Sequence, residues 1–262
     1  MPALLDALGS ARVFDLEQLR YAGAPSHPAH QPGFHYFLHR QHAPGATEAR
    51  TGASGLVVMP EHSGTHIDAL AHQAENLTLH GGVHVDSTVQ TSAGFRVLGI
   101  ETMATLVTRG VLLDVAGTKR LPPDHSITVE ELGRAETASG VAIHAGDVVL
   151  VRTGYGALWS EPDDYLRGAG VSAAGSRWLI DKKVSAVGAD NMAWDVIGPT
   201  DPELGVTLPG HILLLVRAGI PIIENLNLED LAAAGVHEFV FVCLPLKMRG
   251  ATGSPVRPIA IA

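Results

Sequence analysis

Apolar runs recur through the second half of the chain and alternate with amphipathic segments. The runs that have the length of buried strands are 111–115 (VLLDV), 147–153 (DVVLVRT), 184–190 (VSAVGAD), 220–224 (IPIIE) and 238–244 (EFVFVCL). Short apolar runs bounded by glycine, proline or charged residues are typical of strands that are buried on both faces. We therefore expect a central sheet.

Capping residues mark the starts of the intervening helices. Thr128 with Glu131 has the pattern of a capping box, Ser172 precedes AAGSRWLIDKK, and Asn227 precedes LEDLAAAG. Each side-chain oxygen can accept a hydrogen bond from a first-turn amide. Strands that alternate with helices predict an α/β or α+β fold. No repeat or low-complexity linker divides the chain, so we expect residues 1–262 to form a single domain.

The composition narrows the class of protein. The 262 residues are 46% hydrophobic and 17% charged, with a net charge of -9, which argues against disorder and against a nucleic-acid partner. The N-terminus lacks the features of a signal peptide, and runs such as HILLLV are too short to span a bilayer. We expect a cytoplasmic protein without a membrane partner, acting on a small molecule. The single cysteine, Cys243, lies in an apolar run and is expected to be a buried hydrophobe.

Three histidines and an aspartate crowd into the segment 61–72, EHSGTHIDALAH. If the preceding apolar strand continues through it, the two-residue period places His62, Gly64, His66 and Asp68 on one face. Gly64 would then leave room for an ion or substrate. Two imidazoles and a carboxylate with open positions suit Zn²⁺, Mn²⁺ or Fe²⁺, and such an ion activates water. The alternative is a chance cluster of histidines.

The neighbouring positions have other expected roles. Thr65 and Ile67 would face the opposite, packed side of the strand. His72 follows Asp68 by four residues and could turn back toward the same site as a general acid or base, because its ordinary pKa lies near neutrality. It could instead be a further ligand, or a structural histidine at the start of a helix.

The segment HSGTHIDALAH resembles the signature of the cyclase-like family of metal-dependent hydrolases, which includes bacterial kynurenine formamidases and isatin hydrolases. That signature is His-x-Gly-Thr-His-x-Asp-x-Pro-x-His, and this chain departs from it only at Leu70. The departure favours the isatin-hydrolase-like branch. Segments similar to AGDVVLVRTG, VSAVGADN, GIPIIENLNLEDL and GATGSPVRPIA occur in the same order in such proteins.

The resemblance implies roles for individual residues. It implies metal ligation by His62, His66 and Asp68, proton transfer by His72, and a second metal or a water held by His211 and Glu224. From the residues alone, His211 could be an ordinary helix residue and Glu224 a solvated strand end. The resemblance also implies one or two Mn²⁺ or Zn²⁺ ions per subunit. It further implies a compact swivelling β/β/α domain, with a mixed sheet or barrel-like β core flanked by helices, assembled as a homodimer or larger homo-oligomer.

The segment 27–42, HPAHQPGFHYFLHRQH, is rich in histidine and aromatic residues. Phe34, Tyr36 and Phe37 could form a substrate-binding wall that stacks on a flat ring, and Phe34 and Phe37 are our candidate substrate contacts. A proline-broken surface loop is an equal alternative. The histidines of this segment are not expected to bind metal.

The resulting hypothesis is a divalent-metal hydrolase that cleaves a non-peptide amide C–N bond in a small aromatic substrate, such as the cyclic amide of isatin. Alternatives are an arylformamidase acting on N-formylkynurenine, a metal-dependent lyase or cyclase, and a metal-binding or ligand-binding protein without activity. No phosphate-binding glycine loop is present, which argues against a nucleotide cofactor.

Overall fold

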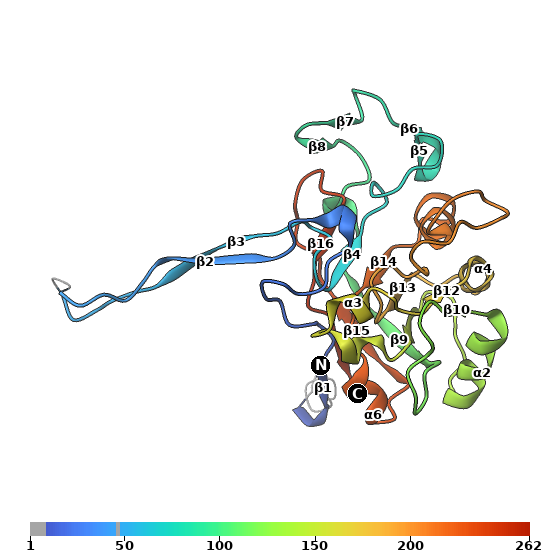
Figure 1. Ribbon diagram of the computed structural model, residues 1–262. Coiled ribbons are helices and arrows are strands. Elements are labelled where there is room, and N and C mark those ends of the chain that lie inside the picture. Colours follow the sequence, from blue (N-terminus) through green and yellow to red (C-terminus); the bar gives the residue numbers. More distant parts are fainter. Residues whose placement is uncertain (1–8, 46–47) are drawn as a thin grey trace.

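A curled, mixed sheet organises the molecule (Figure 1). The computed structural model describes residues 9–45 and 48–262, and within these ranges the main sheet has nine strands. Their order across the sheet is β1 (Val13–Asp15), β17 (Ile259–Ile261), β15 (Glu238–Cys243), β9 (Leu106–Asp114), β11 (Val148–Arg152), β13 (Ala186–Ala189), β14 (Ile222–Glu224), β4 (His66–Asp68) and β16 (Gly253–Pro255). The five strands predicted from apolar runs are all present in it.

The centre of the sheet is parallel and its two flanks are antiparallel. Strands β9, β11, β13 and β14 run in the same direction, whereas β15, β4 and β16 pair antiparallel to their neighbours. Alternate residues of β11 enter different hydrophobic clusters, Leu150 on one face and Val149 on the other. A strand covered on both faces explains why these runs are almost continuously apolar.

The helices cover the sheet and begin close to the predicted positions. They are α2 (Val129–Ser139), α3 (Pro162–Tyr165), α4 (Ala173–Asp181), α5 (Pro209–His211) and α6 (Glu229–Ala233), and α5 continues into a π-helix, η5 (Ile212–Ala218). The Thr128 capping box and the Ser172 cap are both formed. At α6 the predicted start was wrong by one residue: Leu228 is the cap residue, and the Asn227 amide oxygen accepts from the Glu229 amide at 3.3 Å.

Short elements complete the described structure. The 3-10 turns are η1 (Pro28–His30), η2 (His80–Gly82), η3 (Ile100–Thr102) and η4 (Tyr155–Leu158). The two-stranded ladders pair β2 (His35–Arg40) with β3 (Ser54–Val58), β5 (Thr78–Leu79) with β6 (Val83–His84), β7 (Gln90–Thr91) with β8 (Gly94–Phe95), and β10 (Ser126–Ile127) with β12 (Gly170–Val171). The hairpin β2–β3, hereafter the arm, projects far from the rest of the molecule (Figure 1). No helix in the described ranges is long and apolar enough to cross a membrane.

The strand begun at residue 55 does not continue through residue 68, so the strand alternative for the motif was wrong, and an extended loop had been the other possibility. Strand β3 ends at Val58 in the arm, and a turn over residues 61–65 separates it from β4, which belongs to the main sheet. Pro60 cannot donate to a strand ladder, and Gly64 has a φ of 65°, a left-handed conformation that no strand contains. His62 therefore reaches the site from a turn and not from a strand.

Candidate metal centre

Strand β4 positions two of the candidate ligands between two neighbouring strands. His66 lies opposite Glu224 of β14, and Asp68 lies opposite Gly253 of β16. All three candidate ligand side chains on these strands are almost completely buried. Ile67, between them, points into the hydrophobic core, as its place in the two-residue period predicts.

His62 approaches Asp68 from the preceding turn. Its Nδ1 lies 2.8 Å from Asp68 Oδ1, and its Nε2 lies 2.8 Å from the hydroxyl of Thr252. Burial disfavours the charged imidazole, but the hydrogen bond and negative charge of Asp68 outweigh it and raise the pKa of His62. The predicted triad of His62, His66 and Asp68 is therefore assembled, with one ligand atom from each lying within 4.8 Å of the others.

Arg20 holds the turn between the two histidines. Its guanidinium donates to the backbone oxygens of Ser63 and Thr65, and its Nε donates to Glu17 Oε1 at 2.7 Å. A Cβ on Gly64 would lie 2.6 Å from the Arg20 Nη1. The expectation that Gly64 leaves room for an ion was wrong, because the space beside it holds this guanidinium.

Thr65 fixes the other side of the turn. Its hydroxyl accepts from the Gln18 amide at 2.8 Å and donates to the Asn225 carbonyl at 2.6 Å. It is completely buried, as predicted for a residue facing away from the ligands. The glycine that does make room beside an imidazole is Gly253, where a Cβ would lie 2.7 Å from His62 Cε1.

His211 and Glu224 complete a ring of ligands. The Nε2 of His211 lies 3.2 Å from Glu224 Oε1 and 3.7 Å from Asp68 Oδ2. The Nε2 of His66 lies 3.4 Å from Glu224 Oε2 and 3.5 Å from Asp68 Oδ1. The possibility that Glu224 is a solvated strand end was wrong, because its side chain is buried among imidazoles.

Asp195, which the sequence did not single out, orients His211. Its Oδ2 lies 2.9 Å from His211 Nδ1, and its Oδ1 accepts from the Gly210 amide at 2.7 Å. Despite burial, these carboxylate contacts and Glu224 raise the pKa of His211 well above its usual value. A carboxylate behind the distal nitrogen of an imidazole is typical of metal-ligating histidines, because it fixes the ring and its tautomer.

Two carboxylate oxygens have the environment expected of cation ligands. Asp68 Oδ2 and Glu224 Oε1 are buried and have no well-aligned hydrogen-bond donor among the described residues, although His211 Nε2 lies 3.7 Å and 3.2 Å from them. A buried charged oxygen without a partner is costly, and a cation would satisfy both. Burial raises the pKa of Glu224 to about 7 and lowers that of His66 to about 3, so the His66 ring is neutral. Its Nδ1 donates to the Gly64 carbonyl at 2.8 Å, which leaves the lone pair of Nε2 available. The donor set fits a divalent ion.

His72 lies beside the ligands, as predicted. Its ring stacks on that of His62 with centroids 3.9 Å apart, and its Nε2 lies 3.2 Å from the Gln73 amide nitrogen. Burial lowers the pKa of His72 well below its ordinary value, so the imidazole is neutral at neutral pH.

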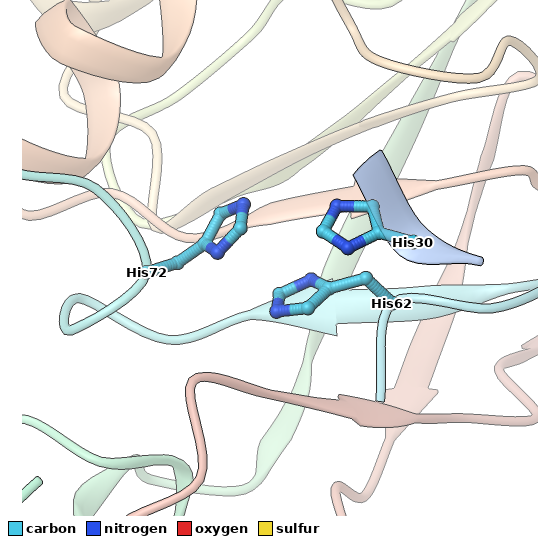
Figure 2. Close-up of side chains that lie close together, drawn as sticks. All are labelled: His30, His62 and His72. Atoms are coloured by element: carbon cyan, nitrogen blue, oxygen red, sulfur yellow. The ribbon is translucent and has the colours of Figure 1, made fainter. Parts of the chain in front are cut away.

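His30, from η1, joins the cluster from the histidine-rich segment. Its ring stacks on that of His62 with centroids 4.8 Å apart, and Figure 2 shows His30, His62 and His72 facing one another from three separate segments. One nitrogen from each of these rings lies within 4.8 Å of the others, so His30 joins the candidate ligands, although the histidines of residues 27–42 were not expected to bind metal. No local spacing links His30 to the motif, so only the tertiary structure reveals it.

A cavity of about 160 Å³ opens onto these histidines. Apart from the candidate ligands and His72, it is lined by His27, Ala29, His30, Gln73, Met192, Ala193 and Leu208. A larger cavity of about 460 Å³, beside Arg20 and Leu244, is lined by none of the site histidines and does not contain a cluster of candidate metal ligands.

The two candidate substrate contacts lie elsewhere in this chain. Phe34 lines a separate cavity with Pro162 and Leu166, and Phe37 is 54% exposed on the arm. Neither lines the cavity beside the histidines. Their role in substrate binding stays a prediction.

Comparison of the sequence with known protein families identifies the family of this chain. A family model described as "Putative cyclase" matches residues 14–196. The chain belongs to the cyclase family. A solved structure described as a novel cyclase superposes on this chain with a TM-score of 0.85 at 27% identity, covering 100% of this chain and 92% of the other. The expected α/β fold, a curled mixed sheet with flanking helices, is thereby confirmed.

Relatives within the cyclase family have several names. The chain is 30% identical over 207 residues to cyclase-like protein 3 of Oryza sativa subsp. japonica. The alignment covers 78% of this chain and 63% of the rice protein, so the chain spans less than two thirds of that relative's length. It is 25% identical over 214 residues to an isatin hydrolase of Roseibium aggregatum, covering 78% and 73%. It is 26% identical over 206 residues to a kynurenine formamidase of Bacillus thuringiensis subsp. konkukian, covering 78% of each. The resemblance seen in the motif is confirmed.

Proposed function

We propose that this chain is a divalent-metal-dependent hydrolase that cleaves a non-peptide amide C–N bond in a small aromatic carbonyl compound. The observation that carries the proposal is the pair of buried carboxylate oxygens, on Asp68 and Glu224, that lack hydrogen bonds and are surrounded by imidazoles. Relatives named isatin hydrolase and kynurenine formamidase support the reaction class.

His62, His66 and Asp68 would hold a Mn²⁺ or Zn²⁺ ion, and His211 and Glu224 would complete its surroundings or hold a second ion. When bound, such an ion supplies Lewis acidity to a carbonyl oxygen and to water. Asp195 keeps the His211 ring in place behind these ligands.

His72 would move the proton. Its neutral imidazole accepts a proton from water as the water oxygen attacks the carbonyl carbon. The same proton then passes to the amide nitrogen as the C–N bond breaks, which leaves a carboxylic acid and an amine. The Gln73 amide, 3.2 Å from His72 Nε2, limits rotation of the ring.

The cavity lining favours a neutral substrate. Its described residues include no lysine or arginine, and Met192, Ala193 and Leu208 provide apolar surface for a ring. A neutral cyclic amide such as isatin requires no cationic partner. N-formylkynurenine carries an α-ammonium and an α-carboxylate, and the described lining has no lysine or arginine to pair with the carboxylate, so arylformamidase activity is the alternative. Leu70 in the motif also favours the isatin type.

The test combines metal content with turnover. Isatin and N-formylkynurenine are assayed with and without added Mn²⁺ or Zn²⁺, and the product mass shows whether one water is gained, as a hydrolase requires and a lyase does not. We expect His66→Ala to lose metal and turnover together. His72→Ala should keep Mn²⁺ and lose about a hundredfold or more in turnover. Full activity in metal-free protein, or loss of Mn²⁺ in His72→Ala, would overturn the assignment.

We also propose that the chain acts as a homodimer or larger homo-oligomer joined by the arm. Both faces of the arm carry exposed apolar side chains, which are Tyr36, Phe37, Leu38, Leu56, Val57 and Val58. An isolated two-stranded hairpin is marginally stable in water, and contiguous exposed apolar surface is typical of an interface. The small volume of the site cavity fits a pocket that a neighbouring subunit completes.

A further inference from the structure

The three imidazoles of His30, His62 and His72 form a donor set that differs from the proposed catalytic one. This cluster contains three imidazoles and no carboxylate, whereas the proposed catalytic set includes Asp68. His30 comes from η1, His62 from the turn before β4, and His72 from the turn after it, and Figure 2 shows the rings converging. Three histidines with an open fourth position are a zinc-binding arrangement, and imidazole ligands also suit Cu²⁺.

The separation of the nitrogens is compatible with chelation. One nitrogen of each ring lies within 4.8 Å of the others, the same limit that the His62–His66–Asp68 set meets. Nitrogens on a tetrahedral zinc ion lie about 3.3 Å apart, given Zn–N bonds of about 2.0–2.1 Å. A rotation of the stacked rings that shortens each nitrogen–nitrogen separation by at most about 1.5 Å would close the set.

His30 is available to bind an ion. Neither of its ring nitrogens hydrogen-bonds to any residue of the described ranges, and the ring is held by stacking on His62 and by contacts with His27 and His72. A half-buried imidazole with both nitrogens unpaired, facing two others, has donor capacity that the proposed reaction does not use.

We propose that His30, His62 and His72 form an all-nitrogen metal site that selects Zn²⁺ or Cu²⁺ over Mn²⁺. His62 belongs to both sets, so an ion at the all-nitrogen site competes with one that His62 shares with His66 and Asp68. An ion at this site also engages His72, so excess Zn²⁺ inhibits turnover; this consequence, unlike the binding itself, rests on the proposed hydrolase function.

The test measures binding of the ions alone to the full chain by equilibrium dialysis and calorimetry. Asp68→Asn keeps the shape of the side chain but weakens the carboxylate-containing set. We expect this variant to lose Mn²⁺ binding and to retain Zn²⁺ binding. Adding His30→Ala should weaken Zn²⁺ at least tenfold, whereas adding His84→Ala, an exposed histidine of β6, should leave it unchanged.

A second measurement uses the chain without the Asp68 substitution. Cu²⁺ bound to it should show hyperfine coupling to imidazole nitrogens in electron paramagnetic resonance, and His30→Ala should remove one of those nitrogens. Equal Zn²⁺ affinity with and without His30 in the Asp68→Asn background, or an unchanged Cu²⁺ spectrum, would overturn the proposal. Neither readout needs turnover, so a failed amide assay would count against the hydrolase function and leave the site standing.

Discussion

The Arg20 guanidinium holds the turn before β4 in place, because it donates to the backbone oxygens of Ser63 and Thr65, one on each side of Gly64. A lysine at this position has one charged group and cannot donate to both carbonyls in the same planar fork. We expect Arg20→Lys to lower metal affinity about 10–100-fold and the free energy of unfolding by about 1–3 kcal/mol. Calorimetry and urea denaturation provide the two values.

The matched control is Arg257→Lys. Arg257 is 71% exposed and pairs with Asp15 on the surface, where an ion pair contributes little. Its replacement should leave metal affinity unchanged. If Arg20→Lys bound metal as tightly as this control, the guanidinium would be a structural residue that does not position the ligands.

Glu224 predicts how metal affinity depends on pH. Burial raises its pKa from 4.5 to about 7, so below pH 7 the metal-free protein keeps a proton that an ion must displace. Affinity should therefore rise at least tenfold per pH unit below pH 7 and continue to rise above it for as long as His211 holds a proton. The raised pKa values of His62 and His211 act in the same direction.

Dissociation constants measured from pH 5.5 to 8 check this dependence. Calorimetry in two buffers with different ionisation enthalpies counts the protons released. Glu224→Gln should bind metal more weakly, with a shallower slope. An affinity that is flat across this range, or that falls as pH rises, would show that Glu224 does not ligate the ion.

At the residue scale, the sequence predicted the ligands that are close together along the chain. His62, His66 and Asp68 could be found because their spacing is local, and the structure brings them together as expected. Asp195 and His30 could not be found, because their relation to the site depends on how distant segments pack. The role expected of Gly64 failed for the same reason: its neighbour, Arg20, lies far away in sequence.

At the element scale, the close approach of β16 to β4 leaves no room for a side chain at Gly253. A Cβ there would lie 2.7 Å from His62 Cε1 and 3.0 Å from the Ile67 carbonyl oxygen. We expect Gly253→Ala to displace His62, to lower metal affinity at least tenfold and to lower the melting temperature. Metal titration and thermal denaturation test both effects.

Gly133 is the control for Gly253, because a side chain at Gly133 would have free space around it. It lies within α2, and a Cβ there would meet no atom within 4 Å. Gly133→Ala should stabilise the protein by about 0.5–1 kcal/mol and leave the metal site unaffected. A Gly253→Ala variant that behaved like Gly133→Ala would mean that His62 tolerates displacement without loss of the ion.

The elements themselves were largely predictable, because local signals specify them. Apolar runs and capping residues identified the parallel strands and α2 and α4. The strand through the motif was mispredicted because the apolar run at 55–59 belongs to the arm, whose exposed position no periodicity reveals. The insertion of β4 between β14 and β16 joins segments far apart in sequence, and no local pattern encodes that pairing.

At the scale of the whole molecule, the arm predicts an assembly. Phe37 is 54% exposed and lies opposite Leu56 across the arm. A charge at such a site opposes burial against a second copy. We expect Phe37→Asp to shift the protein toward the monomer, as measured by light scattering after size-exclusion chromatography. Leu19→Asp, at a 76% exposed position outside the arm, should leave the mass unchanged. A chain that is already monomeric would refute the proposed assembly.

The position of β4 between β14 and β16 has a consequence for biosynthesis. His66 and Asp68 are translated well before Glu224 and Gly253, which lie on the strands that flank them. On the ribosome, therefore, these candidate ligands wait without their sheet neighbours until the chain has been synthesised beyond Pro255. Ion capture by the complete site is a late event in the life of each new chain, and it depends on the ions available at that moment.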